Sequence, residues 1–447
     1  MKSTSPFQLI VVTICVVLLL AGIGAFALLG GAFGGSPVGA VTLWGTLDSQ
    51  AMQNVISTLR QGDKSFDQIT YVQKDPTTYE SDLVNAIAAG NPPDLFLLPQ
   101  DDLVQLGNKV EIIPYSAVSQ STYVSSYVDE SQLFLTSQGT VALPFAIDPL
   151  VMYWNRDLYA SAGIASPPTY WSDFLNDAPR LTAFDAAKNI SRSAVALGLW
   201  SNVDNVKPIL SALIMQAGDP IVSLSPQSGQ EVPVFGTNPQ NLTENPAEAA
   251  LRFYTDFADP SKTTYSWNNA LSDSRSEFVA GVLATYFGFA SEYAGLVAAN
   301  PNLHFSVALL PQAQGENTEI TYGNLIGIAI ARGSKNPQGA LTIAEKLTSA
   351  TAGAAVSQAF SLPPARRDLI SQGQKNPQSA ASAVFDQSAL ISQAWIDPDP
   401  SGSDQIFQTM IESVVSGAST PADAVSSASE AFARLFATPG STSASSQ

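Results

Sequence analysis

The sequence is poor in the side chains that most often build catalytic and metal sites. Its 447 residues include one cysteine, Cys15, and one histidine, His304. A zinc site made of histidine and cysteine needs three or four ligands, which this chain lacks. No dinucleotide-binding glycine motif, P-loop or nucleophile elbow is present. We therefore expect no metal, no cofactor and no enzymatic activity, with a glycoside-acting enzyme built on paired carboxylates as a distant alternative.

Charge is also scarce, and positive charge most of all. Charged residues make up 13% of the chain, about half the usual share. Lys and Arg number 20 against 38 Asp and Glu, which gives a formal net charge of -18. A nucleic-acid partner calls for a basic surface, so we expect no such partner. The hydrophobic share of 45% is enough for a large core, and the length predicts more than one folding unit.

One long apolar run lies at the N-terminus. No charged residue occurs between Phe7 and Phe33, and about 20 apolar residues suffice to cross a bilayer as a helix. Lys2 precedes the run and Asp48 is the next charge, which favours a cytoplasmic N-terminus. A cleaved signal peptide and a lipoprotein modified at Cys15 are the alternatives, and all three readings put the rest of the chain outside the cytoplasm. We predict a cytoplasmic stub (1–6), a transmembrane anchor or uncleaved signal (7–33) and a tether (34–39) at the cell membrane.

Short apolar runs then alternate with segments of helical periodicity. Strands are predicted at 40–44, 68–72, 94–98, 141–144 and 150–154. Helices are predicted at 52–59, 77–89 and 156–162, from Thr169 to Leu175, from Asn245-Pro246, from Asn336-Pro337, and over 404–435 with breaks at Gly417 and Pro421. Thr77 and Glu80 have the spacing of a capping box. The alternation indicates an open α/β sheet, which binds ligands at the carboxyl ends of its strands.

Five segments follow one another in a characteristic order. They are YESDL at 79–83 with AAGNPPDL at 88–95, LPFAIDPLVMYWNRDLY at 143–159, EFVAG at 277–281, ALLP at 308–311 with SKNP at 334–337, and LPPAR at 362–366. In this order they resemble the family-1 extracellular solute-binding proteins of ABC importers, the group that includes the maltose-binding proteins. Tyr170 splits the family's usual threonine-tryptophan pair, and Ala284-Thr285 replaces its alanine-methionine. Leu98 stands where maltose-type relatives carry tryptophan, which argues against a maltodextrin-type stack.

The resemblance implies an α/β, two-lobed periplasmic-binding-protein fold (type II-like) with a hinge, preceded here by the N-terminal transmembrane helix. By position, one lobe is 40–148 plus 305–348, the other is 149–304 plus 349–437, and 438–447 is a loose tail. The chain would cross between lobes at Asp148-Pro149 and before Pro311. The ligand would lie between the lobes and close them.

Candidate ligand-binding residues are rings and planar polar groups near the expected cleft. Aromatic rings stack on the apolar face of a sugar, and carboxylates and amides bind its hydroxyls. Trp44 and Asp48 follow the first strand, Asp101 follows the buried strand, and the resemblance adds Asp148 and Phe289. The full set is Trp44, Asp48, Gln100, Asp101, Asp148, Trp200, Asn202, Phe289, Tyr322, Asn324 and Trp395.

These observations together predict a monomeric binding protein that captures a small solute and delivers it to the permease subunits of an ABC importer. A sugar or oligosaccharide is the expected ligand. A polyamine or other cation is the first alternative, because acids and aromatic rings also suit a cation. A membrane-anchored ligand sensor is the second, because one fold serves transport and sensing equally well.

Overall fold

The protein is described by a computed structural model that covers residues 38–225, 231–238, 244–315 and 318–437. The predicted anchor and tether over residues 1–37 and the predicted tail over 438–447 lie outside these ranges. None of the helices in the described ranges combines the length and hydropathy that a bilayer crossing requires.

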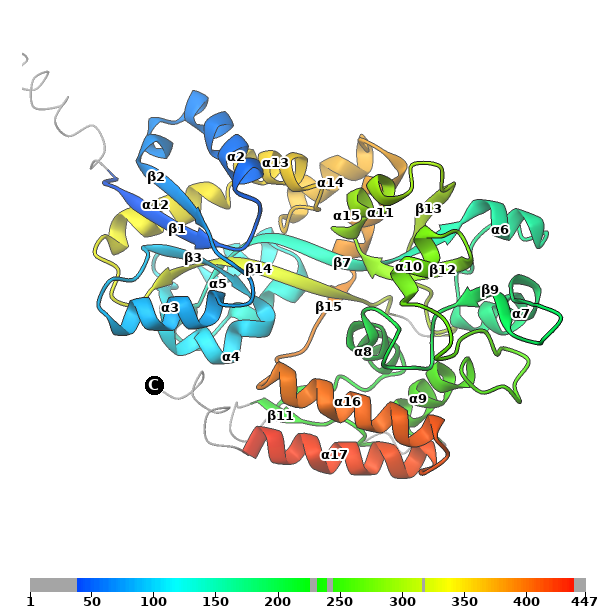
Figure 1. Ribbon diagram of the computed structural model, residues 1–447. Coiled ribbons are helices and arrows are strands. Elements are labelled where there is room, and N and C mark those ends of the chain that lie inside the picture. The colour runs from blue at the N-terminus through cyan, green and yellow to red at the C-terminus, as the bar shows by residue number, and fades with distance from the viewer. Residues whose placement is uncertain (1–37, 226–230, 239–243, 316–317, 438–447) are drawn as a thin grey trace, which may run out of the picture.

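Two α/β lobes lie side by side and are joined by long shared strands (Figure 1). The first lobe contains β1 (Val41–Gly45), α2 (Ser49–Gly62), β2 (Ile69–Gln73), α3 (Tyr79–Ala88), β3 (Leu95–Pro99), α4 (Leu103–Leu106), β4 (Val110–Glu111), β5 (Ile113–Pro114), α5 (Gln120–Ser126), β6 (Gly139–Thr140), α12 (Pro337–Leu347) and α13 (Ala350–Phe360), with the 3-10 helices η1 (Lys64–Gln68), η2 (Gln100–Asp102), η3 (Gly107–Lys109) and η4 (Asp129–Phe134). The second contains α6 (Arg156–Ser161), α7 (Trp171–Leu181), β8 (Ala183–Phe184), β9 (Ile190–Val195), α8 (Val206–Gln216), β10 (Val222–Leu224), β11 (Glu231–Pro233), α9 (Pro246–Asp256), α10 (Ser274–Val279), β12 (Leu283–Phe289), α11 (Glu292–Ala299), β13 (Phe305–Ala308), α15 (Ala380–Leu390), α16 (Pro400–Val415) and α17 (Pro421–Ala437). At the junction lie β7 (Leu143–Asn155), β14 (Thr321–Ala331), α14 (Arg367–Lys375) and β15 (Ser392–Gln393). The two-lobed α/β fold is confirmed.

The first lobe is built on parallel strands, as the apolar runs predict. β1 pairs in parallel with β2 and with β3. Leu95 to Leu98 of β3 are all buried, because α2 and α13 cover one face of the sheet and α3 and α4 the other (Figure 1). Each such leucine contributes about 1.5–3 kcal/mol through burial. The sheet therefore holds the turns after β1 and β3 in fixed positions.

One long strand replaces the two that were predicted around residues 141–154. β7 runs without a break from Leu143 to Asn155. Its first half pairs with β14 in the first lobe's sheet, and its second half pairs with β12 and β13 in the second lobe. Pro149 has no N–H and so suggests a break, but pairing continues through it opposite Gly323. β7 and β14 together carry the sheet from one lobe into the other.

Two segments pack with a different lobe from the one expected. β13, expected in the first lobe, pairs with Met152 to Asn155 of β7 in the second. α13, expected in the second lobe, packs against α2 of the first. The chain therefore returns to the first lobe along β14, after Ile320, whose carbonyl still accepts from Gln216 of α8, and leaves it again after α13.

The helix starts predicted at Asn245 and Asn336 are confirmed, and Asp48 caps a helix that begins three residues before the predicted 52. Asp48, Asn245 and Asn336 each accept a backbone N–H of the first turn of α2, α9 and α12. The predicted capping box of Thr77 and Glu80 is wrong, because the Thr77 hydroxyl binds Asp75 instead and α3 begins two residues later. The predicted cap at Thr169 is also displaced, since α7 begins at Trp171.

Candidate ligand site between the lobes

Gln100 ties the first lobe to the crossing strand. Its side-chain amide donates to the Gly323 carbonyl at 2.7 Å, and its Oε1 accepts from the Leu325 N–H at 3.1 Å. The side chain is 4% exposed, so both contacts are made away from water. The structure therefore places Gln100 at the lobe junction, where its amide fixes the backbone of β14.

Glu130 of η4 lies beside the same stretch of β14. It is 3% exposed, and neither carboxyl oxygen makes a hydrogen bond in normal geometry to any described residue. Burial is the main cause that raises the pKa of Glu130, to about 8. A contact with the Ser392 hydroxyl lowers this pKa, and the nearby Asp101 carboxyl raises it further. At neutral pH the group is therefore a carboxylic acid that can donate one hydrogen bond and accept others.

A cavity of about 410 Å³, with Glu130 among its lining residues, lies between the lobes. Its walls come from η4 of the first lobe, the β10–β11 hairpin of the second and the segment after β15. Its lining residues are Asp129, Glu130, Gln132, Leu133, Leu135, Val222, Ser223, Leu224, Glu231, Gln393, Ala394, Trp395 and Ile396. Burial also raises the pKa of Glu231 to about 7. The cavity has the size of a small-ligand site.

Trp395 forms part of this wall. Its ring is 3% exposed and packs against Phe407 and Phe432, and its Nε1 donates to the Ser211 hydroxyl at 3.1 Å. Most of the ring therefore belongs to the core of the second lobe. Little of the ring is available to the cavity, which suits limited contact with a ligand better than stacking.

Lys207 of α8 holds two carboxylates next to this wall. Its Nζ lies 2.9 Å from Asp397 and 2.9 Å from Asp404, 2.9 Å from the Ser403 hydroxyl, and 5.8 Å from the centre of the Trp395 ring. Burial opposes the charged form of Lys207, but Asp397 and Asp404 outweigh it, so its pKa is raised. The only basic side chain of this cluster is thus already paired.

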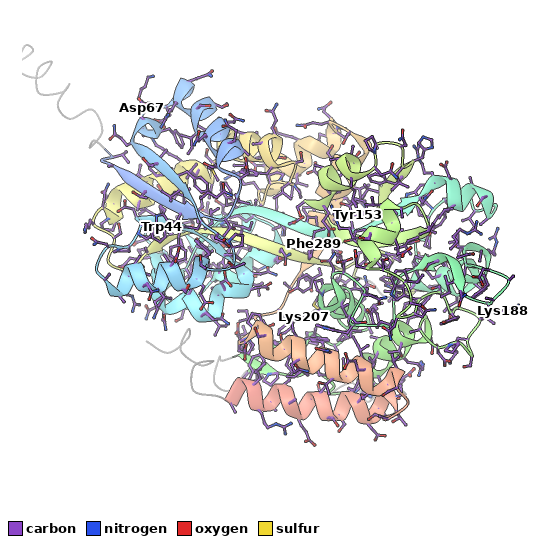
Figure 2. The ribbon with its side chains drawn as sticks, in the orientation of Figure 1. Trp44, Asp67, Tyr153, Lys188, Lys207 and Phe289 are labelled. Carbon is purple, nitrogen blue, oxygen red and sulfur yellow. The ribbon has the colours of Figure 1, made fainter. Side chains whose placement is uncertain are left out.

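Asp101 and Tyr322 complete the junction from the first lobe and the crossing strand. Burial raises the pKa of Asp101, with Lys207 opposing and Asp397 adding to the shift. The phenol of Tyr322 is buried, and its pKa is raised well above the ordinary value by burial and by Asp101, Glu130 and Asp397. Figure 2 shows Lys207 below the crossing strands, beside the start of α16. The structure therefore brings the predicted residues Gln100, Asp101, Tyr322 and Trp395 to one junction.

A second group of predicted residues lies on the same stretch of the crossing strands, since Asn324 stands between Gly323 and Leu325, the two residues that Gln100 binds. Asp148 pairs in register with Asn324 and accepts the Ser291 N–H at 2.9 Å, at the start of α11. Burial is the main cause that raises the pKa of Asp148 to about 6. Phe289 ends β12, is 8% exposed and lies beside the crossing strands (Figure 2). Asp148, Asn324 and Phe289 form a cluster of their own.

Trp44 and Asp48 lie at the carboxyl end of β1, as predicted. The Nζ of Lys74 lies 3.7 Å from the centre of the Trp44 ring and so covers one of its faces. Asp48 is exposed and caps α2 by accepting the Ala51 N–H at 2.8 Å. The Trp44 ring is partly buried and also packs against the hydrophobic core.

Trp200 and Asn202 pack inside the second lobe. Asn202 accepts the indole N–H of Trp267 at 2.9 Å and donates to the carbonyls of Asn268 and Leu271. Trp200 is half-buried against the hydrophobic core. The amide of Asn202 is fully engaged in holding its own lobe together.

The sequence did not single out Glu130, Lys207, Glu231, Asp397 or Asp404. Glu130 lies in a polar stretch, Asp129 to Gln132, that has no feature of a buried site. Lys207 could have been singled out from the sequence, because it is the one charged residue of the apolar helix α8. Asp397 lies in a proline-flanked turn whose burial depends on contacts with α8.

The chemistry of the junction is that of hydrogen-bond recognition. It offers carboxyl groups, a phenol and an indole edge around a cavity. Within the part of the chain that the structure describes, no three histidine, cysteine or acidic side chains gather as a metal site. The arrangement suits the binding of a small polar molecule.

Comparison with known proteins gives the family. The family described as "bacterial extracellular solute-binding protein" matches residues 63–381, well over half of the chain. Binding proteins of Brucella abortus and Brucella suis are 30% identical over 105 residues, a match that covers 23% of this chain and 25% of those proteins. The aligned part thus spans about a quarter of the curated relatives' length.

Solved structures share the fold over nearly the whole described chain. A cyclo/maltodextrin-binding protein in complex with maltotetraose has a TM-score of 0.71 at 15% identity, and covers 91% of this chain and 99% of its own. A solute-binding protein of Thermotoga lettingae bound to tagatose has a TM-score of 0.66 at 20% identity, with coverages of 89% and 100%. UgpB of Mycobacterium tuberculosis, in complex with glycerophosphocholine, has a TM-score of 0.67 at 20% identity, with coverages of 90% and 99%. Such identities establish the fold alone. Together with the family match over residues 63–381, they show that the chain belongs to the bacterial extracellular solute-binding proteins.

Proposed function

We propose that this protein captures a small polar solute, a sugar or oligosaccharide, in the cavity between its lobes and delivers it to an ABC import permease. The observation that carries the proposal is Glu130. Its two buried oxygens have no hydrogen-bond partner among the described residues, and the residue lines an interlobe cavity of about 410 Å³. A buried polar group without a partner is costly unless something binds it. A ligand hydroxyl would satisfy it.

The surrounding groups support a polyhydroxylated ligand. The carboxyl of Glu130 both donates and accepts, as a sugar hydroxyl does. Asp101 adds a second carboxyl with a raised pKa at the junction, and Trp395 adds an apolar edge. Several solved proteins of this fold are complexes with saccharides, among them those with maltotetraose and tagatose. The glycerophosphocholine complex shows that the fold also serves other solutes.

A polyamine or another cation is the second candidate. The observation that favours it is the surplus of acids at the junction. Lys207 is already paired with Asp397 and Asp404, so among the described residues Asp101, Glu130 and Glu231 face the junction without a basic partner of their own. A protonated amine would convert Glu130 to its charged form by pairing with it.

Glu130→Gln separates the two candidates, because glutamine keeps the shape and hydrogen-bonding capacity of the neutral acid and loses its ability to ionise. We would measure the thermal shift of the full-length chain, in mild detergent, with sugars, polyols and polyamines. A neutral hydrogen bond contributes about 0.5–1.5 kcal/mol and a charged one about 1.5–3 kcal/mol. Sugar affinity should therefore fall about tenfold or less in the variant, and polyamine affinity about tenfold to a hundredfold or more. A shift with neither class would contradict the proposal.

The remaining expectations concern the assembly. We propose a membrane anchor at the N-terminus, permease subunits as partners and a monomeric state. The family places the binding domain outside the cytoplasm. Cell fractionation with a protease-accessibility assay tests the anchor, because an anchored domain stays with the membrane and is cut from outside. Release of the intact domain into the medium would contradict the anchor.

A further inference from the structure

A second cavity, of about 430 Å³, lies on the other side of the crossing strands. It is enclosed by α13, α14 and α15, with Tyr293 of α11 at its rim. Figure 1 shows these helices on one side of β7 and β14, whereas α8 and α16, which carry the Lys207 cluster, lie on the opposite side. None of its lining residues also lines the interlobe cavity.

Asp386 gives this cavity its chemistry. It lies in the middle of α15, lines the cavity and is 8% exposed. No hydrogen bond or ion pair joins its carboxyl to any described residue. Burial is the cause that raises its pKa, to about 6, so the group is ionised at pH 7.5 and above. Neither oxygen is fully shut off from solvent, so a ligand in the cavity can replace the water that the carboxylate otherwise binds.

Gly373 of α14 makes room for this carboxylate. A β-carbon at this position would lie 2.1 Å from Oδ2 of Asp386. The glycine therefore lets α14 approach the acid without filling the space beside it. The position of Asp386 is thus set by two helices and does not depend on a flexible loop.

The other lining groups add no positive charge. Among the described residues of the wall there is no lysine, arginine or histidine. Side-chain amides of Gln358, Gln372 and Asn376 offer carbonyl oxygens, and the rings of Tyr293 and Phe385 meet edge to face at 5.9 Å. Carboxylate, carbonyl oxygens and aromatic faces all attract a cation that has N–H groups to donate.

We propose that this cavity is a second ligand site, which binds a small protonated primary amine through Asp386. The ammonium group supplies the donors and the charge that the carboxylate lacks, and the rings of Tyr293 and Phe385 contact the carbon chain. This site is distinct from the interlobe cavity and does not depend on which solute that cavity takes.

The test is a calorimetric titration of the full-length chain, in mild detergent at pH 8, with putrescine. The neutral diol 1,4-butanediol, which has the same carbon chain, is the matched probe. Asp386→Asn keeps the side chain's shape and removes its charge, and Asp75→Asn, which makes the same change at an exposed acid outside both cavities, is the control. We expect putrescine binding at least about tenfold weaker in Asp386→Asn, retained in Asp75→Asn, and absent or far weaker for the diol.

The proposal is overturned if Asp386→Asn binds putrescine as the unaltered chain does, or if the diol binds equally well. Carbodiimide coupling gives a second measurement that needs no variant, because it joins a carboxylate to an amine held beside it with loss of water. Peptide mass spectrometry should find the putrescine adduct at Asp386 in excess of that at the exposed Asp75. An adduct at Asp75 with none at Asp386 would also refute the site.

Discussion

The Oε2 atom of Glu130 lies 2.0 Å from the point where a β-carbon on Gly323 would stand. The glycine is in β14, opposite Pro149 of β7, and its carbonyl accepts the amide of Gln100. One missing methyl group on the crossing strand therefore makes room for the acid at the interlobe cavity. The placement of Glu130 thus depends on a residue that is far away along the chain.

Gly323→Ala should destabilise the protein and weaken ligand binding together. The added methyl group must displace a buried carboxyl, and overpacking of this kind costs about 1–3 kcal/mol. Chemical denaturation measures the change in the free energy of unfolding. In Gly323→Ala with Glu130→Ala, the space vacated by the carboxyl should make the loss smaller than the sum of the two single losses. Strict additivity would show that the two side chains do not compete for space.

The free energy of unfolding should fall as the pH rises through the range in which Glu130 ionises. The pKa is about 8 in the folded chain against 4.5 ordinarily, so between these values the folded state holds a proton that the unfolded state has released. Each pH unit then costs at most about 1.4 kcal/mol, and the loss ends above pH 8. In Glu130→Gln, urea denaturation at several pH values from 5 to 8.5 should show a shallower fall. Equal slopes in both chains would disprove the raised pKa.

Lys207→Met should be among the most destabilising single changes at the lobe junction. It leaves Asp397, which is 3% exposed, without its ionic partner, and breaking a buried pair in this way costs about 3–5 kcal/mol. Asp404→Asn is the matched control, because its side chain is 51% exposed and exposed ion pairs contribute about 1 kcal/mol or less. Thermal unfolding compares the two. Similar losses in both variants would mean that Asp397 finds another donor.

The tryptophans at the two ends of the junction should behave differently. Trp395→Ala removes a ring that is 3% exposed and should cost about 3–5 kcal/mol of stability. Trp44 is half-buried beneath Lys74, so Trp44→Ala should cost about 1–2 kcal/mol. Denaturation gives the stabilities, and titration with the ligand found in the screen gives the affinities. If the ligand affinity falls more in Trp44→Ala than in Trp395→Ala, the Trp44 ring has the stacking role that the sequence predicts. If the affinity of Trp44→Ala is unchanged, the ring does not contact the ligand.

Local patterns predicted the fold well because they report on the strands and helices themselves. The buried run at 94–98 became β3, the Asn245 and Asn336 caps began α9 and α12, and Gly417 with Pro421 separated α16 from α17. The order of short segments gave the family, which the match to residues 63–381 confirms. The assignment of 305–308 and 350–360 to lobes failed, because strand pairing and helix packing between distant segments decide it.

The candidate site was less predictable, for a physical reason. Residues at the ends of strands, such as Asp101, could be found because a sheet edge is visible in the sequence. Glu130 could not, because its burial results from a glycine on another strand and a hairpin of the other lobe. Asn202 looked like a ligand residue and holds a loop of its own lobe. Polar side chains with internal partners and those that bind a ligand have the same appearance in a sequence.

The shared strands β7 and β14 have a mechanical consequence. Two strands bonded along their edges form a ribbon that twists and bends readily across its thin direction. Sliding one strand past the other would break the ladder between Leu143 and Pro149 of β7 and their partners in β14. The ribbon can therefore bend and twist, but the lobes cannot rotate freely about it. It restricts the path along which the lobes can approach each other.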